Sequence, residues 1–362
     1  MTDRASLGSI SAADWRMALD EALVGLEGAA RTGAGLLYVD DGFAEALDPI
    51  VDELVRRTGV SSWFGSVTRG VFGAGRTATG AGSLAVLLTP WDESRYRFVG
   101  GGRSPEPAAE PAPVRRWALV HGDRRLRRAL PVPLRRLPAG TFAVGGLTAS
   151  GGAPIHVLHR PAEDDLGAMV LDPGVEVVAR ISQGCRPIGP AHEVSAANGS
   201  WIRRLDERPA YEVLRDEVGE ILSRQPERIG GYIHVEVTGT DDLRFIRPIL
   251  ALEPRSGEIA TAEPLRRGQR LRFVKRDAGA ARASFEATLE QLRQDLRGRE
   301  PGAALYIASR ARLTTLFEDP ASEVRMVEDM LGPVPLIGFC SDGEIFDARL
   351  HDWSSILVLF PW

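Results

Sequence analysis

Apolar and polar positions along the chain follow two periods, one typical of helices and one typical of strands. A stripe at helical spacing follows Ser11, a good N-cap residue with Asp14 at the capping-box position, and ends at Gly33. Further helices are predicted at 43–55, 209–222, 280–296 and 320–331. Short apolar runs typical of buried strands lie at 36–39, 62–67, 84–88, 141–144, 152–158, 175–181, 232–237, 243–252, 270–275, 304–307, 336–339 and 356–360. This alternation predicts an α/β class, in a mixed α+β arrangement with mixed sheets flanked by helices.

The beginning and the end of the chain resemble each other. The matched segments are Gly35–Val39 with Ala303–Ile307, Trp63–Ser66 with Leu336–Phe339, Gly70–Phe72 with Gly343–Ile345 (or, one residue further, with 344–346), and Leu87–Trp91 with Val358–Trp362. Gly65 and Gly338 each interrupt a strand, which often marks a bulge or a close approach to the backbone. The pattern predicts two related halves that share an internal repeat of strand, helix, strand, turn and strand.

Composition narrows the function classes. The chain has 362 residues, a formal net charge of −5, two cysteines and one lysine, Lys275. This length suits one large or two medium domains. A phosphate-binding loop of the Walker type is excluded, because its lysine is missing. The N-terminus lacks the apolar stretch of a secretory signal, and no segment is apolar enough to predict a membrane span. Two widely spaced cysteines then indicate a reduced, cytoplasmic protein.

A basic segment lies between Arg115 and Arg136, where eight arginines accompany one acid, Asp123. Such a cluster is either a patch for nucleic acid or another anion, or a solvated rim. Trp117 is the only interleaved aromatic residue. The solvated rim is the favoured interpretation, and no nucleic-acid partner is expected.

No catalytic or metal motif is complete in the sequence. Gly70–Thr77 has the spacing of a phosphate loop with Arg76 in place of lysine, but a strand-like run follows it, so we interpret it as a turn. His156 and His159 are three residues apart in or after a strand, where they would point to opposite faces. No metal site and no catalytic residue are therefore predicted. A single proximal histidine would still suffice for haem.

Two loop clusters are the candidates for ligand binding. The first runs from Ser182 to Pro190, and the second from Gly338 to Ile345. The candidate residues are Gly184, Cys185, Arg186, Gly189, Gly338, Cys340, Asp342, Gly343 and Glu344. Arg186 would receive a carboxylate, and Asp342 or Glu344 an amine, in a pocket between the halves. The alternative is that Arg186 only ties a loop down and that Asp342 and Gly343 form an ordinary turn.

The run Ile181–Gly189 (ISQGCRPIG) resembles the signature in the middle of FIST-domain proteins. Pro335–Ile345 resembles the C-terminal FIST segment, and Trp63–Val67 and Gly145–Ala149 resemble Gly-rich strands of the N-terminal one. The resemblance implies a FIST N-terminal segment at 1–200 and a FIST C-terminal segment at 201–362. One departure is that Ala308–Arg312 keeps arginine but lacks a cysteine that the family often carries.

The resemblance implies an intracellular sensory module in signal transduction that binds small ligands such as amino acids or similar carboxylates. With no expected room for an output domain, such a module would stand alone and act on a downstream signalling protein. Some family members are haem-based nitric oxide sensors, so haem is the alternative to a protein without a cofactor. An enzyme of unknown type is the second alternative.

Overall fold

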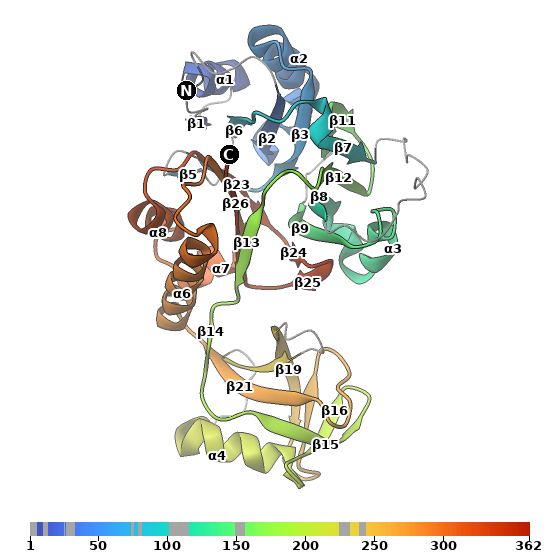
Figure 1. The fold of residues 1–362 in the computed structure, drawn as a ribbon. Helices are drawn as coiled ribbons and strands as arrows, with labels where there is room; N and C mark the ends of the chain where they lie inside the picture. The colour runs from blue at the N-terminus through green and yellow to red at the C-terminus, as the bar shows by residue number, and fades with distance from the viewer. Residues whose placement is uncertain are drawn as a thin grey trace. The chain divides into compact units, whose positions relative to one another are not determined.

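The computed structural model describes residues 6–9, 14–24, 26, 33–73, 76–78, 82–100, 116–148, 156–223, 232–238 and 244–362. The chain forms two compact units, unit 1 with residues 1–182 and 286–362, and unit 2 with residues 183–285. Helices and mixed sheets occur together, which confirms the predicted class (Figure 1). The expected cap Ser11 and part of the Gly70–Thr77 turn lie outside the described residues.

Unit 1 contains three copies of one motif: a strand, a helical segment, a parallel strand, a hairpin and a strand that returns antiparallel to the first. Repeat 1 comprises β2 (Ala34–Asp40), η1 (Asp41–Ala46), α2 (Leu47–Thr58), β3 (Ser62–Thr68), β4 (Val71–Gly73), β5 (Arg76–Ala78) and β6 (Ser83–Leu88). Repeat 2 comprises β8 (Arg116–Asp123), η3 (Arg124–Arg128), α3 (Pro131–Leu134), β9 (Thr141–Thr148), β10 (His156–Leu158), β11 (Arg160–Ala162) and β12 (Leu166–Leu171). Repeat 3 comprises β22 (Ala303–Ser309), α7 (Arg310–Leu316), α8 (Ser322–Leu331), β23 (Leu336–Ser341), β24 (Glu344–Phe346), β25 (Arg349–His351) and β26 (Ser355–Phe360). The predicted repeat is confirmed, and the structure adds the middle copy.

The three repeats exchange their hairpins. Each repeat contributes its first, second and last strands to one six-stranded sheet, but its hairpin pairs with another repeat's sheet. The hairpin β4–β5 joins the sheet of repeat 3, β10–β11 joins that of repeat 1, and β24–β25 joins that of repeat 2. The far edges of these sheets are β1 (Ser6–Ser9), β7 (Tyr96–Val99) and β13 (Val178–Ser182). No repeat therefore completes its sheet alone, and unit 1 holds together as one body.

A glycine at the same position in each repeat brings the two parallel strands close. Gly65, Gly145 and Gly338 lie opposite Leu37, Val120 and Tyr306 respectively. A Cβ atom on these glycines would lie 1.6, 1.8 and 1.9 Å from the facing carbonyl oxygens. These contacts explain the strand glycines that the sequence pattern singled out.

The pairing register corrects the sequence alignment by one residue. The alignment matched Tyr38 with Tyr306, whereas the glycine register matches Leu37 with Tyr306 and Tyr38 with Ile307. Side chains alternate between the faces of a strand, so a slip of one residue exchanges the inner and outer faces. Tyr38 and Ile307 accordingly belong to the same buried cluster.

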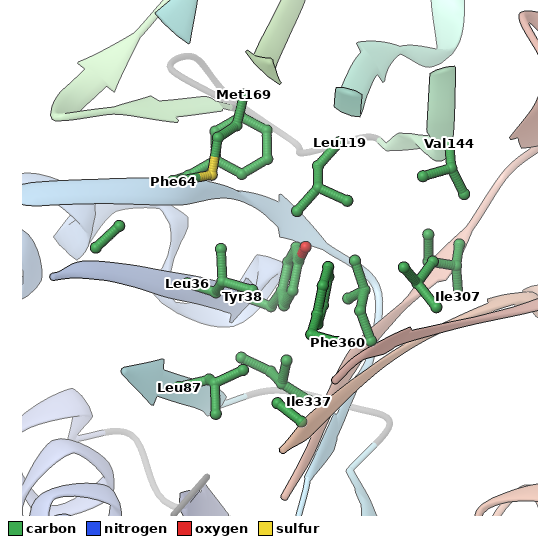
Figure 2. Close-up of a cluster of buried hydrophobic side chains, with 14 of the residues drawn as sticks. Leu36, Tyr38, Phe64, Leu87, Leu119, Val144, Met169, Ile307, Ile337 and Phe360 are labelled. Carbon is green, nitrogen blue, oxygen red and sulfur yellow. The ribbon is translucent and has the colours of Figure 1, made fainter. Parts of the chain in front are cut away.

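The central core of unit 1 lies where the three sheets face one another. Leu36, Leu119 and Leu305 come from equivalent positions of the three repeats and are at most 1% exposed. Figure 2 shows Tyr38, Leu119 and Ile307 pointing toward one another from these sheets. A second cluster packs α1 (Trp15–Val24) and α2 against the outer face of the repeat 1 sheet. The strands are therefore buried on both faces, and their continuous apolar runs reflect this.

Unit 2 is a β-barrel inserted between β13 and β22. Its closed ring is formed by β15 (His192–Asn198), β16 (Trp201–Leu205), β20 (Glu258–Thr261), β19 (Arg244–Glu253), β18 (Ile233–Thr238) and β21 (Arg270–Arg276). The short strands β14 (Cys185–Pro187) and β17 (Arg208–Pro209) extend it, and α4 (Ala210–Ser223) packs on it. The chain returns to unit 1 along α6 (Ala278–Leu296).

Candidate functional site

Polar side chains gather where the inner strands of repeats 1 and 2 end. Strand β2 pairs in parallel with β3 and ends at Asp40, and strand β8 pairs in parallel with β9 and ends at Asp123. Each aspartate caps the helical segment that follows. Ligand sites in open parallel sheets form at this edge, outside the carboxyl ends of the strands. We call the buried group nearby the central polar cluster: Tyr38, Ser66, His121, Thr148 and His156.

Two hydrogen bonds join the repeats within the central polar cluster. The Tyr38 hydroxyl and His121 Nε2 are 3.1 Å apart, and the hydroxyls of Ser66 and Thr148 are 2.7 Å apart. The His121 ring also stacks on Phe64, with the ring centroids 4.5 Å apart. Burial, reinforced by repulsion from His156, lowers the pKa of His121 well below its usual value, although the Gly65 backbone opposes the shift. His121 is thus a neutral ring at physiological pH.

His156 is the least satisfied member of the central polar cluster. It is 0% exposed and lies opposite Ser66 in the β3–β10 pairing. Neither ring nitrogen makes a hydrogen bond of ordinary geometry within the described residues. Burial lowers its pKa to about 4, although the Asp165 backbone and the charges of Asp123 and Asp165 act in the opposite direction. A neutral imidazole of this kind offers one donor and one acceptor.

Glu344 occupies in repeat 3 the position that His156 occupies in repeat 2. Glu344 lies opposite Gly146, as His156 lies opposite Ser66. Its carboxyl accepts hydrogen bonds from the Ser341 hydroxyl at 2.5 Å and from the Ser354 amide and hydroxyl at 3.0 and 2.7 Å. Complete burial raises its pKa to about 7, even though these hydrogen bonds oppose the shift. Glu344 therefore ties its hairpin to β23 and to the residue before β26, and it has few acceptor sites left for a ligand.

The other predicted residues of the second cluster have backbone roles. Gly338 makes the close strand contact, and the backbone groups of Asp342 and Gly343 pair with Leu147 at 2.8 and 2.7 Å. The Asp342 carboxylate lies 3.5 Å from the Arg310 guanidinium. Cys340 is buried, and burial raises the pKa of its thiol to about 12. This thiol is therefore protonated and poorly reactive.

The first predicted cluster belongs to unit 2. Gly184 has a φ of +66°, Cys185 is partly exposed, and Arg186 is exposed on β14 opposite Lys275. The amide side chain of Gln183 anchors this stretch, since it donates to the Arg244 carbonyl at 2.7 Å and accepts from the Ile246 amide at 2.9 Å. Arg186 in unit 2 and Glu344 in unit 1 thus belong to separate compact units.

Gly189 of the same stretch accommodates a largely buried carboxylate. A Cβ atom on Gly189 would lie 2.2 to 2.3 Å from the carboxyl atoms of Glu217. Glu217 in turn contacts His192 Nε2 at 2.6 Å, and Asp206 contacts His192 Nδ1 at 2.6 Å. The stretch Ile181–Gly189 therefore borders a group of three side chains, Asp206, His192 and Glu217, that the sequence pattern did not indicate.

The two histidines of the H-x-x-H pair diverge as predicted. His156 is buried, whereas His159 is exposed and has a φ of +64°. Across the described parts of the chain, no three or more His, Cys, Asp or Glu side chains are grouped to hold a metal ion.

Part of the basic segment is neutralised by acids. Arg125 pairs with Asp123, Arg136 pairs with Asp165 at 2.9 Å, and Arg127 pairs with Asp352. These contacts favour the solvated rim among the two interpretations of the arginine cluster.

Comparison with known protein families shows which family this chain belongs to. A FIST N domain model matches residues 33–208, and a FIST C domain model matches residues 210–347. The chain is a FIST-domain protein. The FIST family has a general role in sensory signal transduction. The junction of the two matches, like the expected junction at residues 200 and 201, lies inside unit 2, so the FIST segments and the compact units divide the chain differently.

The curated relatives of this FIST-domain protein carry no assigned function. An uncharacterized protein of Mycobacterium tuberculosis strain H37Rv is 31% identical over 237 residues, which is 61% of this chain and 61% of that protein. An uncharacterized protein of Mycobacterium bovis is 32% identical over 237 residues, which again is 61% of this chain and 61% of that protein. The match thus spans about three fifths of the length of these relatives. None of the described helices is both long and apolar enough to span a bilayer.

The central polar cluster of the FIST-domain protein was missed at the level of sequence. The sequence pattern points to His156 only as half of a possible metal pair, and it does not single out His121. The sequence signal that could have revealed this cluster is the middle repeat, in which Gly145 aligns with Gly65 and Gly338. That alignment matches the strand of His121 with the strand of Tyr38.

Proposed function

We propose that this FIST-domain chain is a sensor that binds a small polar ligand at the central polar cluster and signals to a downstream protein. The observation that carries the proposal is the buried imidazole of His156, whose two nitrogens have no hydrogen-bond partner of ordinary geometry among the described residues. Buried polar groups almost always have hydrogen-bond partners, and leaving one without a partner costs about 1–3 kcal/mol. A ligand that supplied those partners would recover this free energy.

The chemistry of the cluster indicates what the ligand offers. Neutral His156 can donate one hydrogen bond and accept another, and Ser66 and Tyr38 add hydroxyl groups. An amino acid or a similar small carboxylate has acceptor oxygens for these donors. Glu344 has about one acceptor site left beyond its three hydrogen bonds from Ser341 and Ser354, which suits at most one N–H of an amine.

The test begins with native mass spectrometry of the purified chain, to detect a co-purified small molecule. A thermal-shift panel of amino acids and small carboxylates follows. We expect a mass adduct or a ligand-dependent increase in Tm for the wild type and for His159→Leu, but not for His156→Leu. His159 is the matched control because it is exposed and three residues away. Equal binding by His156→Leu, or no binding by the wild type across the panel, would refute the site.

A haem-based gas sensor is the second candidate, and the same observation supports it. Axial ligation needs an imidazole nitrogen that is not already engaged. Within the part of the chain that the structure describes, His156 meets this requirement, whereas both nitrogens of His192 contact carboxylates. Haem, when bound, would supply the gas-binding iron. A Soret band after reconstitution that disappears in His156→Leu would support this candidate, and its absence in the wild type would eliminate it.

A further inference from the structure

Unit 2 contains a histidine held between two carboxylates from different elements. His192 opens β15, Asp206 follows β16, and Glu217 lies on α4. Both contacts are 2.6 Å, and the side chains of His192 and Glu217 are each 11% exposed. We call these three residues the His192 clamp. A ring that contacts a carboxylate through each nitrogen needs two N–H donors, which only the protonated imidazole has.

The clamp joins α4 to the stretch Ile181–Gly189, which carries the FIST signature. The Glu217 carboxyl lies where a side chain on Gly189 would be, so this helix residue sits directly on the backbone of that stretch. The helical path of α4 breaks two residues later, at Gly219, where φ is +77°. Glu217 is therefore at the end of the regular part of the helix, and the remaining oxygen of its carboxyl, Oε2, has no partner among the described residues.

The charges around the clamp favour the protonated ring. Burial alone would lower the pKa of His192, but hydrogen bonds to Asp206 and Glu217 and their charges outweigh it, so the pKa is raised. Glu193 on β15 donates its backbone amide to Asp206, and Arg270 on β21 reaches the Ala191 carbonyl at 3.2 Å. Arg270 also stabilises ionised Asp206.

We propose that the His192 clamp is a proton-binding site that controls the attachment of α4 to the stretch containing Gly189. With its proton, His192 bridges Asp206 and Glu217. When the proton leaves to solvent, one ring nitrogen becomes an acceptor, and Glu217 is left as a largely buried carboxylate without that donor. The end of α4 then separates from Gly189. This inference goes beyond the ligand site of unit 1 and does not depend on it.

The direction of the pH effect follows from linkage. Because the pKa of His192 is raised on folding, the stabilisation is fully present below the unfolded value of 6.5 and is lost as pH rises through the folded value. The clamp is therefore closed in mildly acidic solution and opens in alkaline solution.

Two measurements on the full-length chain test the clamp. NMR titration of the histidine Cε1–H signals, with His192 assigned by its loss in His192→Gln, should show a pKa above 6.5 that falls in Glu217→Gln. Hydrogen exchange of residues 210–218, corrected for intrinsic rates, should become faster by up to about tenfold per pH unit between 6.5 and that pKa, and should level off above it, as expected for the loss of one proton. Glu212→Gln on the same helix is the control and should leave both readouts unchanged.

Two outcomes would overturn the proposal: a wild-type His192 that titrates at or below 6.5, or exchange of 210–218 that does not change across its titration. Both outcomes are measured on the wild-type chain, so the proposal can be tested even if a variant fails to fold.

Discussion

Gly65 and Gly338 hold the same position in repeats 1 and 3, and each lets its strand reach the carbonyl oxygen of the neighbouring parallel strand. A side chain there would lie 1.6 Å from the Leu37 oxygen and 1.9 Å from the Tyr306 oxygen. The pair noticed in the sequence is thus a steric requirement of the strand pairing, which Gly145 repeats in the middle copy.

Gly338→Ala should destabilise the chain, because its Cβ atom would meet backbone rather than a movable side chain. We expect the free energy of unfolding to fall by about 2–3 kcal/mol, as for other overpacked sites. Urea unfolding followed by circular dichroism measures it. Gly279→Ala in α6 is the control and should be at least as stable as the wild type, because its Cβ atom would lie in ordinary contact, 3.4 Å from the Asp277 carboxylate, and alanine favours a helix. A wild-type value for Gly338→Ala would contradict the close contact.

Arg312 and Glu323 form an ion pair whose side chains are both 0% exposed, with a distance of 2.7 Å between Nη2 and Oε1. Tyr306 donates a further hydrogen bond to Glu323 at 2.6 Å. Arg312→Met would leave Glu323 buried without its cation, and we expect unfolding to become easier by about 3–5 kcal/mol. The double variant Arg312→Met with Glu323→Leu should recover part of that loss in the same assay. A double variant no more stable than Arg312→Met would count against the ion pair as the cause.

Glu344 should make the chain less stable as pH rises. Its pKa is raised to about 7 in the folded chain from an ordinary value of 4.5, so folding favours its protonated form. The stabilisation is present below pH 4.5 and is lost as pH rises through 7, which amounts to roughly 3 kcal/mol. Glu344→Gln should remove this component from the dependence of Tm on pH between 5 and 8. The exposed Glu318→Gln should follow the wild-type curve.

Arg186→Ala should leave folding intact. Arg186 is exposed, and exposed substitutions usually change stability by less than about 0.5 kcal/mol. The variant therefore separates binding from stability. Because the proposed site in unit 1 does not contain Arg186, we expect the variant to keep the ligand-dependent Tm shift. Loss of that shift with an unchanged ligand-free Tm would instead assign the ligand carboxylate to the first loop cluster. Unchanged affinity would remove Arg186 from the site.

The sequence predicted the elements whose periodicity is strong. The helices at 43–55 and 280–296 and the apolar strands around Leu37 and Leu305 are present, because both kinds of element bury continuous apolar faces. Strands β8 and β12 were missed. In β8, polar residues such as His121 and Asp123 interrupt the apolar run, and they are tolerated there through contacts with Tyr38 and Arg125.

By itself, the sequence determined the class of the fold, the relation between the first and last repeats, and the resemblance to FIST-domain proteins. These follow from local patterns, which need only neighbouring residues. Only the tertiary structure decided the middle repeat, the exchange of hairpins and the central polar cluster. Ser66 and Thr148 meet across 82 residues of chain, and their contact depends on how three sheets close around one core. Pairing over such distances is set by the register of whole strands, which no short motif encodes.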